Sequence, residues 1–381
     1  MSRSSDILIV GAGAYGLSTA FWLRKMRPDL SVTVLDRSDF AGNETGRCCA
    51  GIRVQWGARG NIRLCWEALP MFENFAEIFS YPDGIDFKQT GYAILCHQES
   101  HLAQLRRNAQ VQREFGIVTE FLSPRELAAM APAINIEALV GASFYARDGS
   151  VSPFRVLDGC YRAARREGAD IRYGVTVRSL QRHGDGFTLE SSEGTWQAGK
   201  VVLATDTRIP ELAGQLGVDI PVRPHPNQAM VTEPLPPLLS PCIMAFAKEM
   251  FINQVARGNF VILCGDKRRS MSFDHAPTAE IFPSAAQRAI SLIPQLAQAR
   301  VLRTWGGLYS VTPDMQPALG ESTVAGLYIA LSAAKGFMTG PVAGRLMAQM
   351  IDGQTVEPWV AALTPNRFQG DAVLEAEPAV I

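Results

Sequence analysis

The sequence predicts an α/β protein with two domains, one built on a parallel sheet and the other on an antiparallel sheet. Strands alternate with helices at both ends of the chain and near residue 200, which is typical of a parallel sheet. Two β-rich stretches interrupt these segments, and one of them alternates strands with Pro and Gly turns, as antiparallel sheets do. We therefore expect one domain assembled from separated segments and a second domain built from the insertions.

Length and composition agree with a folded protein of this size. The chain has 381 residues, 36 Lys+Arg against 37 Asp+Glu, and a net charge of −1. At about 150 residues per domain, two or three domains are expected. The balanced charge argues against a protein that mainly binds nucleic acid or an anionic membrane. Only 19% of residues are charged, below the roughly 25% of soluble domains, so much of the chain is expected in an interior or an interface.

The seven cysteines predict neither a disulfide framework nor a metal site. Their number is odd, and no C-x-x-C spacing occurs. Buried thiols in a reducing compartment are the simpler interpretation. The apolar run Ile7–Leu23 is shorter than the roughly 20 residues that a bilayer requires. We therefore expect a cytoplasmic protein without metal and without an integral membrane segment.

A strand–helix–strand unit opens the chain and carries the clearest motif. Gly11, Gly13 and Gly16 form a G-x-G-x-x-G pattern directly after a short apolar run, and Asp36 ends the next strand. The first glycine permits a tight turn, the second lets the backbone approach a pyrophosphate, and the third lets the helix pack on the strand. The helix N-terminus attracts phosphate, and Asp36 can accept hydrogen bonds from ribose hydroxyls. The pattern therefore predicts a dinucleotide site rather than a glycine-rich turn without a ligand.

The other elements follow from periodicity and from caps. Ser123 and Glu126 form a capping box that begins a helix. Further helices are expected at 58–79, 99–115, 153–167, 276–299 and 340–351, and buried strands at 87–95, 200–205 and 327–331. Pro283 and Pro294 must break or kink the helical stretch that contains them.

The size of the cofactor is indicated by loops at the same sheet edge. A strand ending in Ala204 and the later turn AAKGFMTGP supply loops in addition to the glycine turn. A separate NAD-binding chain would normally present one uninterrupted unit. The long, discontinuous cradle instead favours a large cofactor that is held permanently.

These motifs resemble those of the D-amino-acid oxidase/sarcosine oxidase family of FAD-dependent oxidoreductases. The resemblance covers almost the whole chain and is strongest to the flavin-bearing β subunits of dye-linked proline dehydrogenases and heterotetrameric sarcosine oxidases. It is carried by the segments GAGAYG, TGRCCAGIRVQWG (45–57), FKQTGY (87–92), LRTWGGLYSVTPDMQPALG (302–320) and KGFM (335–338). It implies a Rossmann-like FAD-binding domain at 1–85, 145–215 and 300–365 and a substrate-binding domain at 86–144 and 216–299. The sequence pattern itself predicts a loose tail at 366–381.

The resemblance also implies which residues meet the cofactor. Asp36 would hold the adenosine ribose, and Val177 would meet the adenine through its backbone. The full set of expected FAD contacts is Gly11, Gly13, Gly16, Asp36, Arg37, Arg47, Cys48, Val177, Ala204, Gly307, Gly336, Phe337 and Met338. Gly307 stands where covalently flavinylated relatives carry a cysteine, so noncovalent FAD is expected.

Four residues are implied for catalysis. Arg53 matches the family's carboxylate-binding arginine, and Arg offers a bidentate fork for such a group; a surface position is the alternative. Tyr309 matches an aromatic position facing the substrate, although a packed core tyrosine is equally expected. Lys335 replaces a family histidine and would either stabilise reduced flavin or point into solvent. Gln254 would meet the substrate from a roof strand.

The implied reaction is removal of a hydride from the carbon beside an amine nitrogen, delivered to flavin N5. The expected substrate is a small amino acid, preferably a secondary amine such as proline, hydroxyproline or sarcosine, and the product is an imine. Two alternatives stay open: a flavoprotein subunit that relays electrons in a hetero-oligomer with other redox subunits, and a hydroxy-acid dehydrogenase of the same family.

Overall fold

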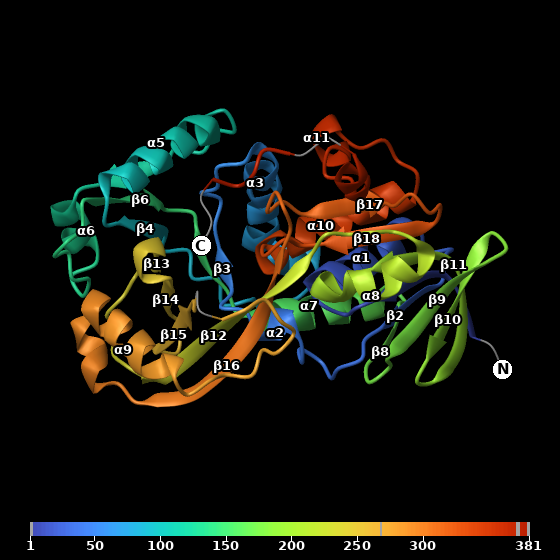
Figure 1. Cartoon of the computed structure of the whole chain (residues 1–381), viewed down its shortest axis with the longest axis horizontal. Coiled ribbons are helices and arrows are strands. Elements are labelled where there is room, and N and C mark those ends of the chain that lie inside the picture. Colours follow the sequence, from blue (N-terminus) through green and yellow to red (C-terminus); the bar gives the residue numbers. More distant parts are fainter. Residues whose placement is uncertain (1–2, 267–268, 371–373, 379–381) are drawn as a thin grey trace.

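The computed structural model describes residues 3–266, 269–370 and 374–378. They form two lobes that lie side by side, each built on an eight-stranded sheet (Figure 1). A short third sheet pairs β3 (Gly51–Ile52) with β7 (Gly149–Ser150). The expected α/β fold class is confirmed, with a mainly antiparallel second sheet. The first sheet is mixed, because it contains antiparallel pairs beside its parallel ones.

The first sheet brings together strands from the beginning, the middle and the end of the chain. Its order is β17-β18-β11-β1-β2-β8, with β10 paired to β11 and β9 paired to β10. The strands are β1 (Arg3–Val10), β2 (Val32–Leu35), β8 (Asp170–Arg172), β9 (Val177–His183), β10 (Gly186–Ser191), β11 (Gly194–Leu203), β17 (Ala318–Glu321) and β18 (Leu327–Leu331). Because Val10 is level with Leu35 and Leu203 in these parallel pairs, the loops after β1, β2 and β11 meet at one edge.

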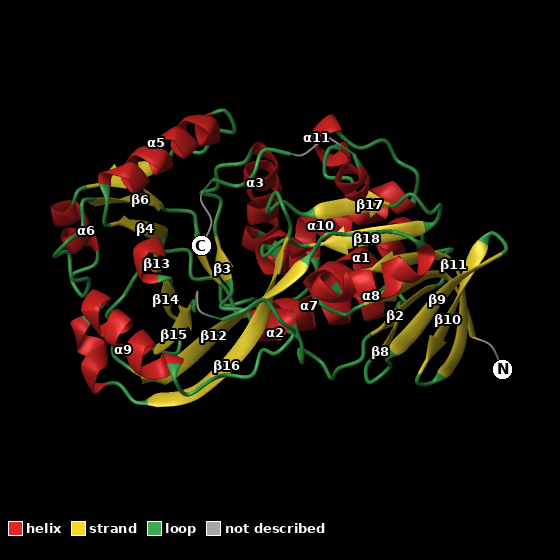
Figure 2. Ribbon diagram, viewed as in Figure 1, coloured by secondary structure: helices red, strands yellow, loops and turns green. Residues whose placement is uncertain are grey.

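Both faces of this sheet are covered, as its uninterrupted apolar strands require. Ile7 and Ile9 face a core that they share with helices α1, α3, α7 and α10, whereas Leu8 and Val10 face a second core with α8 and the β9–β10 hairpin (Figure 2). The helices are α1 (Ala14–Met26), α3 (Arg59–Glu73), α7 (Pro153–Arg166), α8 (Ile209–Ala213) and α10 (Gly336–Ile351). Glycine lets α10 approach α1 closely, because a Cβ on Gly344 would lie 2.3 Å from Ser18 Oγ.

The second sheet has the order β16-β12-β15-β14-β13-β4-β6-β5. Its strands are β4 (Tyr92–Cys96), β5 (Glu120–Leu122), β6 (Gly141–Tyr145), β12 (Arg223–Pro234), β13 (Cys242–Ala245), β14 (Met250–Gln254), β15 (Asn259–Cys264) and β16 (Val301–Val311). Neighbouring pairs are antiparallel except β13 with β4. One face packs on α6 (Pro124–Met130) and α9 (Ile281–Leu292). The other face is covered in part by α5 (Glu99–Arg113), and the rest of it faces the first lobe.

Strand β16 corrects one expected domain boundary. We expected residue 300 to begin the last segment of the FAD-binding domain, but residues 301–311 pair with β12 in the second sheet. The segment therefore joins the first sheet only at β17. The pattern LRTWGGLYSV predicts a strand, but it contains no signal for the sheet to which the strand belongs.

The C-terminal segment corrects the expectation of a loose tail at 366–381. Arg367 is 6% exposed and forms an ion pair with Asp314, and Glu377 is 4% exposed. The partner Asp314 lies 53 residues from Arg367, so local sequence carries no signal of this docking. Residues 371–373 and 379–381 of the expected tail lie outside the described residues.

Three further α-helices of the described residues are short: α2 (Glu44–Arg47), α4 (Phe75–Ile78) and α11 (Pro358–Ala361). Five short 3-10 helices are also present among the residues that the structure describes. No helix in the described part of the chain has the length and apolar character needed to cross a bilayer.

Candidate active site

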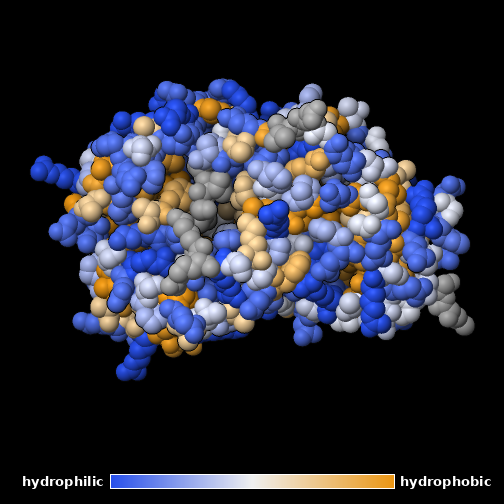
Figure 3. Space-filling view, in the orientation of Figure 1, coloured by the Kyte–Doolittle hydropathy of each residue, from blue (hydrophilic) through white to orange (hydrophobic). Residues whose placement is uncertain are grey.

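A long cavity runs between the lobes along the edge where the loops of the first sheet meet. It is lined by the glycine turn after β1, by the loops after β2, β11 and β18, and by the inner face of the second sheet. The space-filling view shows the surface hollowed between the two lobes (Figure 3). Of the seventeen residues expected to bind cofactor or substrate, all but Gly16 and Gln254 line this cavity.

The nucleotide end of the cavity has the geometry that a dinucleotide requires. Gly11 has φ +109°, and a Cβ there would lie 2.5 Å from Ala204 O. Gly13 is the N-cap of α1, and Ala14 and Tyr15 of the first turn line the cavity. Ala14 N donates to Thr45 Oγ1 at 3.2 Å. Asp36 directly follows β2, is 8% exposed, and accepts hydrogen bonds from Ala12 N at 2.7 Å and Ser38 N at 2.8 Å.

Gly16 has a packing role, which explains its absence from the cavity wall. A Cβ on Gly16 would lie 1.9 Å from Gly11 O, whereas a Cβ on Gly13 would meet only Thr45 Oγ1 at 3.1 Å. We expect Gly16→Ala to lower the free energy of unfolding by about 1–3 kcal/mol through overpacking. Gly13→Ala is expected to change that stability little but to raise the Kd for FAD, because its methyl group enters the cavity.

Thermal melts of the FAD-free protein and FAD titrations of both variants check this expectation. Equal melting points for Gly13→Ala and Gly16→Ala would contradict the different roles assigned to the two glycines.

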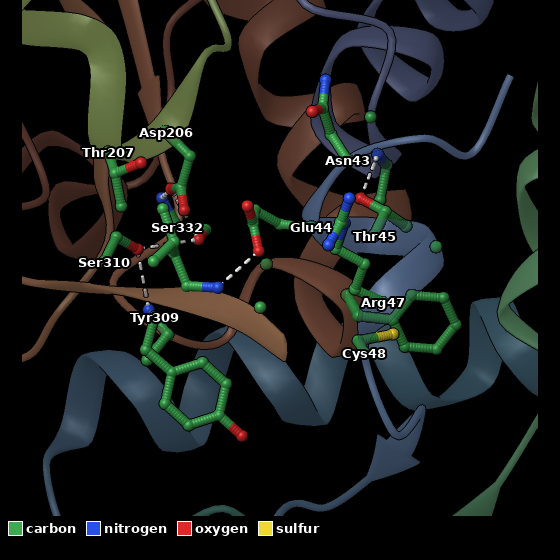
Figure 4. Close-up of a pocket in the computed structure, with 18 of the residues that line it drawn as sticks. Asn43, Glu44, Thr45, Arg47, Cys48, Asp206, Thr207, Tyr309, Ser310 and Ser332 are labelled. Carbon is green, nitrogen blue, oxygen red and sulfur yellow. Dashed lines mark hydrogen bonds between the residues drawn. The ribbon is translucent and has the colours of Figure 1, made fainter. Parts of the chain in front are cut away.

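The middle of the cavity contains two carboxyl groups that the sequence analysis missed. Glu44 accepts a hydrogen bond from Leu308 N at 2.5 Å, and Asp206 accepts one from Ser332 Oγ at 2.8 Å (Figure 4). Burial raises the pKa of Glu44 and of Asp206, and the charge of Asp206 raises that of Glu44 further. Both carboxyl groups accept hydrogen bonds from the protein, and burial opposes their ionisation.

The far end of the cavity contains a buried guanidinium group. Arg53 is 2% exposed, and its Nε and Nη1 atoms have no hydrogen-bond partner among the described residues. Its Cζ lies 3.8 Å from the centre of the Trp56 ring, and Trp56 Nε1 donates to Arg53 O at 3.0 Å. Buried polar groups are normally hydrogen-bonded. The orphaned donors therefore indicate a site for an anionic ligand.

Aromatic and apolar side chains surround this guanidinium. Tyr92 and Phe251 stack with ring centres 5.6 Å apart, and the expected catalytic residue Tyr309 also lines the cavity. Burial raises the pKa of Tyr309, so its hydroxyl stays protonated near neutral pH. Three of the lining residues, Trp56, Tyr92 and Phe251, were not among the expected site residues, although the first two lie in segments that carry the family resemblance.

Lys335 is buried, which corrects the alternative in which it points into solvent. It is 1% exposed, and its Nζ donates to Met315 O at 2.6 Å and Ala333 O at 3.1 Å. Its ammonium also lies 4.6 Å from the centre of the Trp56 ring. Burial lowers the pKa of Lys335 from 10.5 to about 8.

This lowered pKa predicts a pH-dependent stability. Between pH 8 and 10.5 an unfolded chain keeps a proton on Lys335 that the folded chain has lost, so the free energy of unfolding rises with pH in this window. Across this pH window we expect the free energy of unfolding of the native protein to rise by about 3 kcal/mol relative to that of Lys335→Met. The figure follows from about 1.36 kcal/mol for each unit of pKa difference between the folded and unfolded chains. Urea titrations of both proteins at several pH values measure the gain. A constant difference between them would contradict a depressed pKa.

The expected contact of Gln254 with substrate is wrong. Gln254 Oε1 accepts from Leu238 N at 2.8 Å and Leu239 N at 2.9 Å, and its Nε2 donates to Pro236 O at 2.8 Å. On β14 the side chains alternate, so Phe251 faces the cavity whereas Gln254 holds a loop on the opposite side.

The fold and the cavity together define a protein with a dinucleotide-binding cleft under a β-sheet roof. The sequence model of the DAO family, described as "FAD dependent oxidoreductase", matches residues 6–350. The chain therefore belongs to this family, and its cofactor is FAD.

Individual relatives agree with this assignment. The chain is 27% identical over 374 residues to the sarcosine oxidase subunit beta of Arthrobacter sp, covering 96% of this chain and 92% of that protein. It is 27% identical to the crystal structure of L-proline dehydrogenase from P. horikoshii, with a TM-score of 0.88 and coverage of 97% and 99% of the two chains. Glycine oxidase from Geobacillus kaustophilus has the same fold, with a TM-score of 0.89 at 23% identity over 96% and 99% of the chains.

Proposed function

We propose that the protein oxidises a small amino acid whose carboxylate binds Arg53, with a cyclic or N-substituted secondary amine as the preferred substrate. The buried guanidinium with unpartnered Nε and Nη1 carries this proposal, because a carboxylate matches its planar fork. Two relatives support it, because one is named as a subunit of sarcosine oxidase and the other as an L-proline dehydrogenase.

Some residues of this chain would bind the cofactor, and others would orient the substrate. The glycine turn, the first turn of α1 and Asp36 would hold the nucleotide half of FAD, and Gly336–Met338 would lie beside its ring. When bound, FAD supplies the acceptor for the hydride that leaves the carbon beside the amine. Arg53 would orient that carbon, and the wall of Tyr92 and Phe251 would exclude water and fit an apolar substrate body.

Two finer features belong to the same proposal. Gly307 lines the cavity without offering a thiol, which supports noncovalent FAD. Lys335, with its depressed pKa, lies among the residues that line the ring end and would stabilise the negative charge of reduced flavin.

Anaerobic titration of the FAD-loaded protein tests this function. D- and L-amino acids, sarcosine, proline, hydroxyproline and the matching hydroxy acids are added, and the flavin absorbance is followed. We expect bleaching by at least one secondary amino acid and none by hydroxy acids. Bleaching by hydroxy acids alone would replace the proposal with the hydroxy-acid alternative, and no bleaching by any compound would overturn it.

A role as one subunit of a hetero-oligomer is the second candidate, favoured because the Arthrobacter relative is named as a subunit. Turnover of the isolated chain with an artificial electron acceptor separates the two. Bleaching without turnover would favour a chain that passes electrons to a partner subunit.

A further inference from the structure

The loop that carries Arg53, residues 53–58, is held on one side by a buried carboxylate. Asp148 is fully buried and accepts hydrogen bonds from Val54 N at 2.9 Å and from Gln55 Nε2 at 3.0 Å. These bonds fix the part of the loop next to Arg53 against the second sheet, because Gln55 Nε2 also donates to Tyr92 O at 2.9 Å.

On its other side the same loop is held by the C-terminal segment. Glu377 accepts hydrogen bonds from Gly57 N at 2.8 Å and Ala58 N at 3.1 Å, and from Asn61 Nδ2 at 2.7 Å. Ala58 is the N-cap of α3 and provides no side-chain cap. The carboxylate therefore satisfies backbone donors that the helix itself leaves open.

The C-terminal segment is itself held by hydrogen bonds, so it can keep Glu377 in place against the Arg53 loop. Glu377 N donates to Asp314 O at 3.1 Å, and Gln316 Nε2 donates to Glu375 O at 2.9 Å. Pro378 packs on the loop so closely that a Cβ on Gly57 would lie 2.4 Å from its Cγ.

The hydrogen bond between Asn61 and Glu377 also connects the C-terminal segment to Lys335, the second cation of the site. Asn61 Nδ2, which binds Glu377, lies 3.3 Å from Met315 O, and this carbonyl also accepts the Lys335 ammonium. Glu377 therefore contacts the Arg53 loop directly. Through Asn61 it is also linked to the Met315 carbonyl that accepts the hydrogen bond from Lys335.

We propose that Glu377 is a positioning residue that fixes the Arg53 loop in the geometry needed to bind the substrate carboxylate. The C-terminal segment would then complete the substrate site from behind, although it touches no substrate itself. The inference rests on the proposed carboxylate role of Arg53. A guanidinium fork is sensitive to such support, because two parallel hydrogen bonds need both donors in place.

The test uses the FAD-loaded protein and 2-furoate, a five-membered-ring carboxylate without an oxidisable amine. Perturbation of the flavin spectrum gives its Kd in the native protein, Glu377→Ala, Arg53→Met and the double variant. Glu375→Ala is the matched control, because the side chain of Glu375 is exposed and its backbone carbonyl, which the substitution keeps, accepts the hydrogen bond from Gln316. Melting points and FAD content are measured in parallel.

We expect Glu377→Ala to raise the Kd of 2-furoate about tenfold, Glu375→Ala to leave it within twofold, and Glu377→Ala to add nothing in the Arg53→Met background. With a substrate, KM should rise while kcat changes little. If Glu377→Ala lowers the melting point but leaves the Kd of 2-furoate unchanged, Glu377 only caps the helix. If Glu377→Ala raises the Kd by the same factor in the Arg53→Met background as in the native protein, Glu377 does not act through Arg53. Both results overturn the inference.

Failure of the proposed function is recognised separately, because it requires Arg53→Met itself to leave the Kd unchanged. If Glu377→Ala does not retain FAD, the same measurement is made with Glu377→Gln, which keeps one accepting oxygen. An unchanged Kd in that variant also overturns the inference.

Discussion

Arg53→Met is expected to raise the Kd of a carboxylate ligand, and the KM of an amino-acid substrate, by between about 30-fold and 3,000-fold. Removing one partner of a buried, hydrogen-bonded charge pair costs about 2–5 kcal/mol, and 1.4 kcal/mol corresponds to a factor of ten. Met keeps the volume of the side chain and its packing on Trp56 but offers no donor. Titration of the flavin spectrum with 2-furoate and steady-state kinetics measure the two constants.

The same substitution is expected to raise the melting point of the unliganded protein. Arg53 Nε and Nη1 are buried without a partner, and an unsatisfied buried polar group is costly. Binding sites often contain such destabilising groups because function requires them. Arg53→Lys is the control: it keeps the charge, loses the planar fork, and should bind carboxylate with intermediate affinity. A Kd unchanged in Arg53→Met would remove Arg53 from the substrate site.

The nucleotide half of the site could be predicted from sequence because its signals are local. The strand before the glycines, the glycines themselves and Asp36 all lie within residues 3–36, and each belongs to one strand–helix–strand unit. The assembly of the first sheet from separated segments could also be predicted from alternating strands and helices, because parallel strands need crossover connections. The order of its strands could not be predicted in this way.

The substrate half was less predictable because it depends on register and on distant contacts. Gln254 and Phe251 lie on the same strand but on opposite faces, and an odd separation in a strand reverses the direction of a side chain. Lys335 follows a turn that the sequence shows plainly, yet its burial depends on Met315 O and on Trp56. Such contacts leave no periodic pattern in the sequence.

The described part of the C-terminal segment shows the same limitation. Its composition suggests a loose tail, but its interactions join it to residues far away in the chain. Glu377 binds Gly57 across 320 positions, and Arg367 binds Asp314 across 53. Only the folded structure shows that these residues are buried.

Arg367→Ala is expected to lower the free energy of unfolding by about 3–5 kcal/mol, the usual cost of leaving a buried charge without its partner. The side chains of Arg367 and Asp314 are 3% and 1% exposed, and Arg367 Nε lies 2.8 Å from Asp314 Oδ2. The guanidinium also donates to Leu363 O at 2.9 Å and to Gln316 O at 2.9 Å, so several acceptors lose their donor at once.

An exposed ion pair provides the control for this measurement. Arg59 and Glu114 form a pair whose side chains are 58% and 52% exposed, and such surface pairs contribute about 0–1 kcal/mol. Urea and thermal unfolding of Arg367→Ala and Arg59→Ala should therefore differ clearly, with only the first variant shifted by several degrees. If Arg367→Ala melts with the native protein, residues 366–370 contribute nothing to stability and the loose-tail interpretation of that stretch is restored. If it melts early and also binds 2-furoate weakly, the docked segment supports the substrate site as well as the fold.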